Sequence, residues 1–245
     1  MNEQKIVVVT GAAGVLGKSV SEMFLREGMK VVLADIDQEK LNRLSTELNG
    51  EVFPIAFDVG DYIQVEKAVK KILEKYGKVD ILVNNAGILS NNKSQETTPE
   101  EWRNIHRINL DGTFYLSKAI IPIMKEKGWG RIINTCSLAG KNGGLTAGTA
   151  YSSSKGGMIA LTLSLALETA AYGITVNGIA PAYIKTPMIT EQLTEEQRKE
   201  VLEKIPVHRF CEPEEFAHIV RFLSDPLAGF ITGEIIDQNG GLRVD

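Results

Sequence analysis

A tyrosine and a lysine four residues apart, Tyr151 and Lys155, form the pair in this sequence best suited to chemistry. In a helix their side chains leave the same face one turn apart. An ammonium beside a phenol stabilises the phenolate, whose pKa is otherwise about 10, so Tyr151 could act as a base near neutral pH. The Ser137 hydroxyl could polarise the oxygen that Tyr151 protonates or deprotonates. The three residues indicate proton transfer on an alcohol or ketone, although the pair alone is common on solvated helix faces.

Such a tyrosine needs a cofactor for the hydride, and the N-terminal residues offer a candidate site. A β-branched run at residues 6–9 predicts a buried strand, followed by a glycine-rich stretch and a helical pattern. Glycines let the backbone approach a pyrophosphate, which the positive helix N-terminus attracts. The alternative is a tight strand-to-helix turn without a ligand. The candidate contacts are Gly11, Gly14, Val15, Leu16 and Gly17.

The second predicted strand, residues 30–34, ends at Asp35, which lies 24 residues after Gly11. A dinucleotide site places a carboxylate near this spacing, where it binds the ribose hydroxyls and repels a 2′-phosphate. No Arg or Lys stands at residues 12–15 or at Ile36 to bind such a phosphate. The sequence therefore predicts NAD rather than NADP. The alternative is that Asp35 caps the next helix.

Strand and helix patterns alternate along the rest of the chain. This order predicts one α/β domain over residues 1–245, with a Rossmann-type doubly wound parallel sheet and helices on both faces. Residues 184–208 lack a regular pattern and are interpreted as a lid. Ligands bind outside the carboxyl ends of such strands, where Gly11, Asp35, Asn85, Ser137 and Pro181 fall. The further strands are expected at residues 51–57, 79–83, 131–135, 174–179 and 231–236, and long helices at 62–76, 99–127, 151–171 and 212–223.

Composition narrows the possible partners. The 245 residues carry a net charge of −4 without a run of Lys or Arg, which argues against nucleic acid. No apolar run is long enough for a membrane span. Two cysteines and three histidines show no spacing of metal ligands, and the thiols are expected to be reduced in a cytoplasmic protein. We expect a small-molecule substrate.

The chain resembles the shorter type of short-chain dehydrogenase/reductase over nearly its whole length. The Asn-Asn-Ala-Gly run at residues 84–87 and the ordered set Asn109, Ser137, Tyr151 and Lys155 carry the resemblance together. It implies a seven-stranded sheet and a homotetramer that pairs through the long helices. It also implies that Asp58 and Val59 hold the adenine, that Asn85, Ala86 and Gly87 lie beside the cofactor, and that Pro181, Ile184 and Thr186 lie on the nicotinamide side.

The resemblance also implies a role for each member of the catalytic set. Tyr151 would be the acid or base, and Lys155 would lower its pKa and hydrogen-bond the nicotinamide ribose. Ser137 would hold the substrate oxygen. Asn109 would anchor a water that continues a proton relay from Lys155.

The chain departs from the family pattern at three places. Val15 stands where a glycine is usual, which bears on how closely the pyrophosphate approaches. Ala182 replaces a usual glycine after Pro181. The interval from Ser137 to Tyr151 is one residue longer than the commonest spacing, and the extra residue is placed in a loop at 141–149 that is expected to line the substrate cleft.

The leading functional hypothesis is an NAD(H)-dependent oxidoreductase that interconverts a ketone and a secondary alcohol of polyol, sugar, sugar acid or hydroxyacid type. One alternative is a 3-oxoacyl-(acyl-carrier-protein) reductase. Asp35, the negative net charge and Tyr172, where those reductases often carry Arg, weigh against it. Another alternative is a non-catalytic NAD-binding regulatory or structural protein, which the intact catalytic set disfavours.

Overall fold

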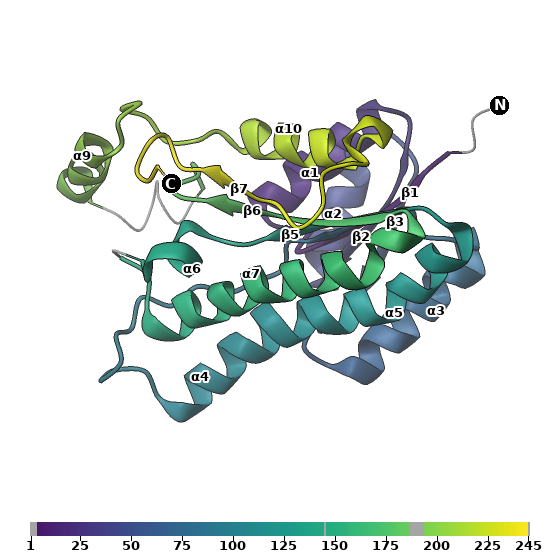
Figure 1. The fold of residues 1–245 in the computed structure, drawn as a ribbon, viewed down its shortest axis with the longest axis horizontal. Helices are drawn as coiled ribbons and strands as arrows, with labels where there is room; N and C mark the ends of the chain where they lie inside the picture. The colour runs from purple at the N-terminus through teal and green to yellow at the C-terminus, as the bar shows by residue number, and fades with distance from the viewer. Residues whose placement is uncertain (1–3, 145, 187–193, 245) are drawn as a thin grey trace.

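The computed structural model describes residues 4–144, 146–186 and 194–244 and contains a seven-stranded sheet (Figure 1). Every neighbouring pair of strands is parallel, and the order is β3-β2-β1-β4-β5-β6-β7. This is the predicted doubly wound Rossmann-type arrangement. The strands are β1 (Ile6–Thr10), β2 (Lys30–Asp35), β3 (Val52–Ala56), β4 (Ile81–Asn84), β5 (Gly130–Thr135), β6 (Ile174–Pro181) and β7 (Ile235–Gln238).

Helices cover both faces of the sheet, as Figure 1 shows. On one face lie α1 (Val15–Arg26), α2 (Gln38–Glu47) and α10 (Pro213–Ser224). On the other lie α3 (Tyr62–Tyr76), α5 (Gly112–Lys127) and α7 (Thr149–Thr169). The remaining elements are α4 (Pro99–His106), the π-helix η1 (Arg107–Asp111), α6 (Leu138–Asn142), α9 (Glu195–Lys204) and the short 3₁₀ turns η2 (Ala170–Tyr172) and η3 (Pro226–Ala228).

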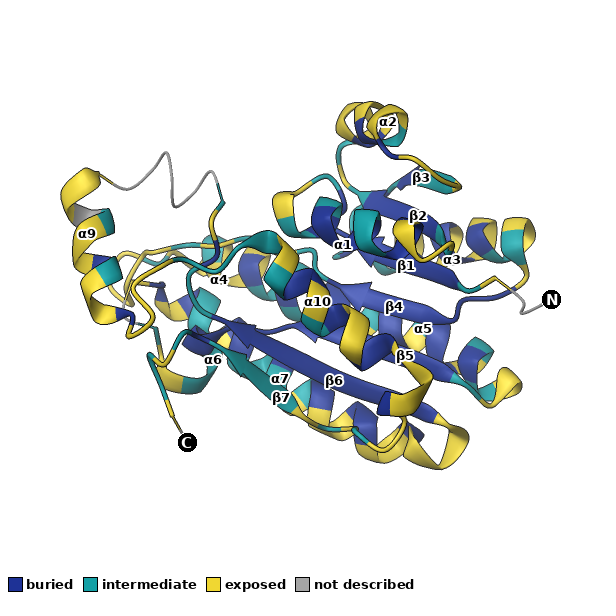
Figure 2. Ribbon diagram, turned by 90° about the horizontal axis from the view of Figure 1, so that it is seen from above, coloured by how far each residue is buried: buried dark blue, intermediate teal, exposed yellow. Residues whose placement is uncertain are grey.

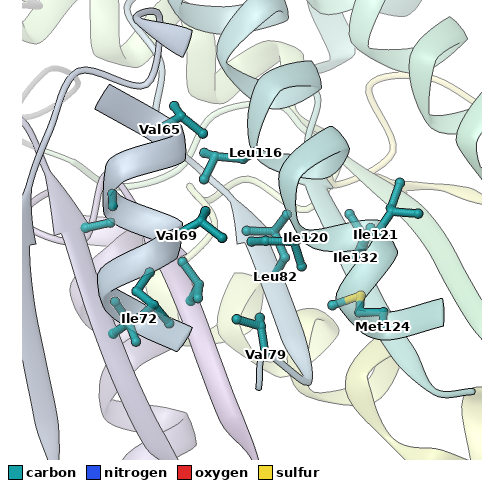
Figure 3. Packing of buried hydrophobic residues seen from close by; sticks show 14 of the residues in the cluster. Val65, Val69, Ile72, Val79, Leu82, Leu116, Ile120, Ile121, Met124 and Ile132 are labelled. Carbon is teal, nitrogen blue, oxygen red and sulfur yellow. The ribbon is translucent and has the colours of Figure 1, made fainter. Parts of the chain in front are cut away.

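The central strands are buried on both sides, which Figure 2 shows as a continuous dark band. Successive residues of β1 therefore enter opposite cores: Val8 packs towards α3 and α5, and Val9 packs towards α1. Figure 3 shows the first core, where Val69 and Ile72 of α3 face Ile120 of α5. Each fully buried aliphatic side chain contributes about 1.5–3 kcal/mol of transfer free energy. Packing in the two cores fixes the parallel strands, so their carboxyl ends lie together at one edge of the sheet.

Helix α3 begins and ends where the sequence predicts. The Asp61 side chain accepts hydrogen bonds from the backbone nitrogens of Ile63 (3.0 Å) and Gln64 (3.2 Å). Gly77 ends the helix in the left-handed conformation.

Most predicted ends of helices and strands lie within two residues of the observed ends, and the larger differences concern the helix at 99–127 and the last strand. The helix expected at residues 99–127 is interrupted by η1, which contains Asn109. The helix expected at 151–171 begins at Thr149. The last strand, expected at 231–236, begins only at Ile235, because the Thr232 hydroxyl and the Asn177 side chain take hydrogen bonds that a ladder would otherwise make.

Part of the predicted lid is helical. The helix α9 occupies residues 195–204, while residues 187–193 of the predicted lid lie outside the described part of the chain. None of the described helices combines the length and the apolar character that crossing a membrane requires.

Candidate active site

A cleft of about 580 Å³ opens at the carboxyl ends of β4, β5 and β6. Ser137, Tyr151 and Lys155 line it together, although they come from two different elements. The structure therefore brings three of the four predicted catalytic side chains to one place. Six predicted cofactor contacts also line the cleft: Leu16, Asn85, Gly87, Pro181, Ile184 and Thr186.

Ser137 and Tyr151 meet because α6 and α7 pack together after β5. Ser137 is the N-cap of α6, and its hydroxyl accepts a hydrogen bond from the Ala139 backbone nitrogen at 3.1 Å. Tyr151 lies in the first turn of α7. Burial raises the pKa of Tyr151 above its ordinary value, while a hydrogen bond with Ser137 acts in the opposite direction. A tyrosine in this environment holds its proton, which suits a proton donor.

The direction of this pKa shift differs from the sequence expectation. Lys155 was expected to stabilise the phenolate, yet its Nζ lies 5.8 Å from the centroid of the Tyr151 ring and donates to the Thr135 carbonyl at 2.6 Å. Burial of the phenol therefore dominates. Burial also lowers the pKa of Lys155 to about 8, since a buried ammonium loses its hydration.

Asn109 is fully buried and acts as a clamp on the segment after β4. Its Oδ1 accepts a hydrogen bond from the Ile88 backbone nitrogen at 2.8 Å, and its Nδ2 donates to the Ile88 carbonyl at 3.0 Å. The same Nδ2 contacts the Ser154 hydroxyl at 3.0 Å. Asn109 therefore joins η1, α7 and the Asn-Asn-Ala-Gly segment. Its proposed role in a water relay remains a prediction.

The glycine-rich turn packs so closely that side chains do not fit at two positions. A Cβ on Gly17 would lie 2.2 Å from the Gly11 carbonyl oxygen, and Gly11 itself has φ +61° beside Ala86. Asn85 holds the turn from β4, since its Nδ2 donates to the Thr10 carbonyl at 3.0 Å. The N-terminus of α1 is thereby fixed at the sheet edge.

The first turn of α1 is open to an anion. Its N-cap is Gly14, which makes no side-chain capping bond, and no acidic residue occupies the first turn. The Val15 side chain is exposed, and Leu16 faces the cleft. The unusual Val15 therefore leaves the glycine turn intact.

Asp35 lies at the end of β2, and backbone amides hold its carboxylate beside the glycine turn. Its Oδ2 accepts from the Ala13 nitrogen at 3.1 Å, and its Oδ1 accepts from the nitrogens of Ile36 (2.8 Å) and Asp37 (3.3 Å). The helix cap is a different residue, because Asp37 accepts from the Lys40 nitrogen at the start of α2. The Ile36 side chain is exposed. The alternative reading of Asp35 as the helix cap is therefore wrong.

Asp58 and Val59 are tied to the long helix region. The Asp58 carboxylate accepts from Arg107 Nη1 at 2.7 Å and from the Gly60 nitrogen at 2.8 Å. Val59 is buried against Gly112, where a Cβ would lie 2.8 Å from Val59 Cγ2. The contacts fix this loop, while its predicted contact with adenine remains untested.

The segment after β6 is anchored by a short stretch near α10. The Ala182 nitrogen donates to the Gln238 carbonyl at 3.0 Å, and Ile184 pairs with Cys211 as an isolated parallel bridge. Pro181, Ile184 and Thr186 line the cleft, with Ala182 in place of the usual glycine, and their contact with the nicotinamide remains a prediction.

Comparison with known proteins agrees with this geometry. The sequence model of the short chain dehydrogenase family matches residues 5–197. The chain belongs to the short-chain dehydrogenase family. It is therefore an oxidoreductase by family.

Individual members of the family resemble the chain end to end. The 3-oxoacyl-[acyl-carrier-protein] reductase FabG of Thermotoga maritima is 38% identical over 99% of both chains. A short-chain dehydrogenase structure from Brucella melitensis, titled glucose/ribitol dehydrogenase, has a TM-score of 0.92 at 35% identity and covers 99% of this chain and 98% of its own. A Brucella melitensis 3-oxoacyl-[acyl-carrier protein] reductase with bound NAD has a TM-score of 0.91 at 33% identity, covering 100% and 93%.

Sequence reasoning missed several residues that support this short-chain dehydrogenase site. The Thr10 hydroxyl accepts hydrogen bonds from the backbone nitrogens of Asn85 and Ala86, both at 3.0 Å. A β-branched residue at a strand end carried no separate signal. The loop expected to line the cleft does so, through Asn142, Gly144, Thr146 and Ala147. The walls that sequence reasoning missed include Leu89, Tyr183 and Leu242, which come from separate segments without a motif.

The described residues of this short-chain dehydrogenase offer no candidate metal site. Within residues 4–144, 146–186 and 194–244, no three or more His, Cys, Asp or Glu side chains gather where they could hold a metal ion.

Proposed function

We propose that the protein is an NADH-dependent reductase of 3-oxoacyl thioesters. The observation that carries the proposal is that Tyr151 and Ser137 line one cleft together with the apolar side chains of Leu89, Val201 and Leu242. Burial raises the pKa of Tyr151, which favours its protonated form as a donor. The end-to-end similarity to the Thermotoga maritima reductase supports the thioester substrate over the polyol or sugar substrate favoured by the sequence.

The residues present fit a nicotinamide dinucleotide. The open N-terminus of α1 would receive the pyrophosphate. Asp35, whose carboxylate is oriented by three backbone amides, would bind the ribose hydroxyls and repel a 2′-phosphate. Gly87 leaves room beside the catalytic residues, because a Cβ there would lie 3.6 Å from Lys155 Nζ and 3.1 Å from Asn109 Oδ1. These features favour NADH over NADPH.

The protein residues would handle the proton and orient the ketone. When bound, the nicotinamide supplies the hydride. Ser137 and Tyr151 would both donate hydrogen bonds to the 3-oxo oxygen, which stabilises the negative charge that develops there. Tyr151 would then transfer its proton to that oxygen. Lys155, charged at neutral pH and fixed by Thr135, would stabilise the phenolate left behind.

The walls of the cleft support an acyl substrate. Leu89, Val201 and Leu242 contribute apolar side chains to its lining. An acyl chain would bury its methylene groups there, each worth about 0.8 kcal/mol when fully buried. Tyr183 and Thr146 supply hydroxyl groups 3.4 Å apart at the same walls, which could contact the thioester carbonyl.

The test is NADH oxidation by the purified protein with acetoacetyl coenzyme A and with longer 3-oxoacyl thioesters. NADPH is assayed in parallel, and NAD reduction is assayed with polyols, sugars and hydroxyacids. We expect turnover of the thioesters that is faster with NADH. Turnover confined to a polar secondary alcohol would contradict the thioester assignment and support the second candidate.

That second candidate, a dehydrogenase of small polar alcohols, is favoured by two observations. Tyr172 is half-exposed beneath the Lys125 ammonium, 4.1 Å from the ring centroid, where acyl-carrier reductases often carry Arg. The cleft also contains polar side chains, Asn91 and Asn142. The thioester and alcohol panels of the same assay separate the two candidates, and NAD binding without any turnover would favour a regulatory protein.

A further inference from the structure

The loop that follows β4, residues 88–93, has two sides with different partners. Ile88, Leu89 and Asn91 line the cleft. The side chains of Ser90 and Asn92 contact Glu101 on α4 instead. The loop therefore forms one wall of the cleft. It is held by Asn109 at Ile88 and by the Thr97 hydroxyl at the Asn92 carbonyl, and its outward side chains are held by the Glu101 carboxylate.

The Glu101 carboxylate accepts the hydrogen bonds that the Ser90 and Asn92 side chains donate to α4. The Ser90 hydroxyl donates to Oε1, and Asn92 Nδ2 donates to Oε1 at 3.2 Å and to Oε2 at 3.0 Å. The Ser90 contact lowers the pKa of Glu101 most, followed by the Asn92 contact. Glu101 is itself held by the Thr98 cap of α4, whose Oγ1 accepts from the Glu101 nitrogen at 3.2 Å. The carboxylate is thus ionised and anchored to a helix start.

The same loop holds the first turn of α7, the helix that carries Tyr151. The Gly148 nitrogen donates to the Ser90 carbonyl at 2.7 Å, and the Thr149 nitrogen donates to the Asn92 carbonyl at 3.1 Å. Helix N-termini leave such nitrogens without intrahelical partners, so the loop supplies the missing acceptors. A Cβ on Gly148 would lie 2.4 Å from the Asn92 oxygen, so the loop and the helix start are in close contact.

We propose that Glu101 is a positioning residue for catalysis: through Ser90 and Asn92 it sets the loop that holds the start of α7 and hence the place of Tyr151. The inference rests on the proposed role of Tyr151 as proton donor. Glu101 touches no cleft residue that would contact substrate. Its effect is transmitted through two side-chain contacts and two backbone hydrogen bonds. Tyr151 is only two residues from Thr149, so a shift of the helix start displaces the phenol.

The experiment exchanges the hydrogen-bonding groups on either side of the contact. Glu101→Gln keeps an acceptor for Ser90 but places an amide nitrogen against Asn92 Nδ2. Asn92→Asp instead places two carboxylates together. We expect each to lower kcat for acetoacetyl coenzyme A with NADH about tenfold, because small misplacements of catalytic groups are costly. The double variant restores a donor opposite an acceptor and should return kcat to within about threefold of the original protein. The KM for NADH should change by less than about twofold.

Glu100→Gln is the matched control, because the neighbouring Glu100 carboxylate pairs with the exposed Arg103 side chain at 3.4 Å and not with the loop 88–93. It should leave kcat unchanged. Single variants with unchanged kcat, or a double variant as impaired as the singles combined, would overturn the proposal. Ser90→Ala removes one hydroxyl only and gives a milder test in case the other variants fail to fold. We expect it to lower kcat by an intermediate amount.

Amide exchange separates this inference from the proposed function. In the peptide that contains Gly148 and Thr149, Glu101→Gln should accelerate hydrogen exchange and Glu100→Gln should not. If the original protein fails to turn over acetoacetyl coenzyme A, the substrate proposal is wrong, and the exchange measurement still decides the positioning role. Unchanged exchange in Glu101→Gln would contradict it.

Discussion

The cofactor side and the substrate side of the cleft are built in different ways. On the cofactor side, Gly11, Gly17, Asp35 and Asn85 are held by backbone hydrogen bonds or by packing that excludes a Cβ. On the substrate side, backbone hydrogen bonds join the loop 88–93 to the start of α7, but the walls themselves present side chains such as Leu89, Val201 and Leu242, and the Thr146 and Tyr183 hydroxyls lie 3.4 Å apart. The residues of the proposed cofactor side are thus fixed by their own backbone and packing, whereas the substrate side is shaped by the side chains that happen to line it.

The largest effect that tests whether the two sides are independent is expected when the proton donor alone is removed. Tyr151→Phe should lower kcat by about 10³-fold, in the range that general acid catalysis contributes. Its affinity for NADH should stay within about twofold, because the cofactor side is held independently. Steady-state kinetics and fluorescence titration with NADH measure the two effects. Tyr172→Phe, a half-exposed tyrosine beyond the far end of α7, is the control and should change neither. A large loss of NADH affinity in Tyr151→Phe would mean that the two sides are not separable.

The charge of Lys155 gives a pH test of the catalytic side. Its pKa is lowered to about 8, so the ammonium is present below pH 8 and lost above it. We expect kcat/KM for reduction to fall about tenfold per pH unit above 8, or about 100-fold by pH 10. The unfolded chain binds more protons at this lysine between about pH 8 and 10.5, so the free energy of unfolding attributable to Lys155 rises with pH in that window. A profile that stays flat to pH 10 would remove the charged lysine from the mechanism.

Cofactor choice gives the smallest of the three effects. Asp35→Ala removes the carboxylate that repels a 2′-phosphate, so the ratio of kcat/KM for NADPH to that for NADH should rise about tenfold, equivalent to about 1.4 kcal/mol. Asp37→Ala is the control on the neighbouring carboxylate. It removes the cap of α2, which lowers stability, and should leave the cofactor ratio unchanged. An unchanged ratio in Asp35→Ala would mean that the backbone amides alone set the preference.

The fold and the cofactor side were largely predictable from sequence. Buried β-branched runs give strands, Asp61 and Gly77 mark the ends of α3, and Gly11 and Gly17 mark a turn whose geometry admits no other residue. These signals are local, because each residue type is set by the backbone conformation or the helix end at its own position.

The substrate side was predicted only at the loop 141–149, because its other parts meet only through the fold. Leu89, Val201 and Leu242 carry no motif, and nothing in their neighbours indicates that they share a cleft. The π-helix at Asn109 and the raised pKa of Tyr151 were missed for a related reason. Both depend on packing and burial from distant segments, and the predicted effect of Lys155 considered only its spacing along the helix.

The strand order has a consequence for how the chain folds during synthesis. The chain builds β1, β2 and β3 outward in one direction and then returns to add β4 on the other side of β1. Until residues 81–84 emerge, one edge of β1 presents unpaired backbone groups, which exposes the nascent chain to edge-to-edge aggregation. Once β4 pairs, the glycine turn, Asp35 and Asn85 are all in place, well before the ribosome reaches Tyr151. The part of the sheet that would bind the dinucleotide can therefore form first, and an early-bound cofactor would stabilise a half-made protein.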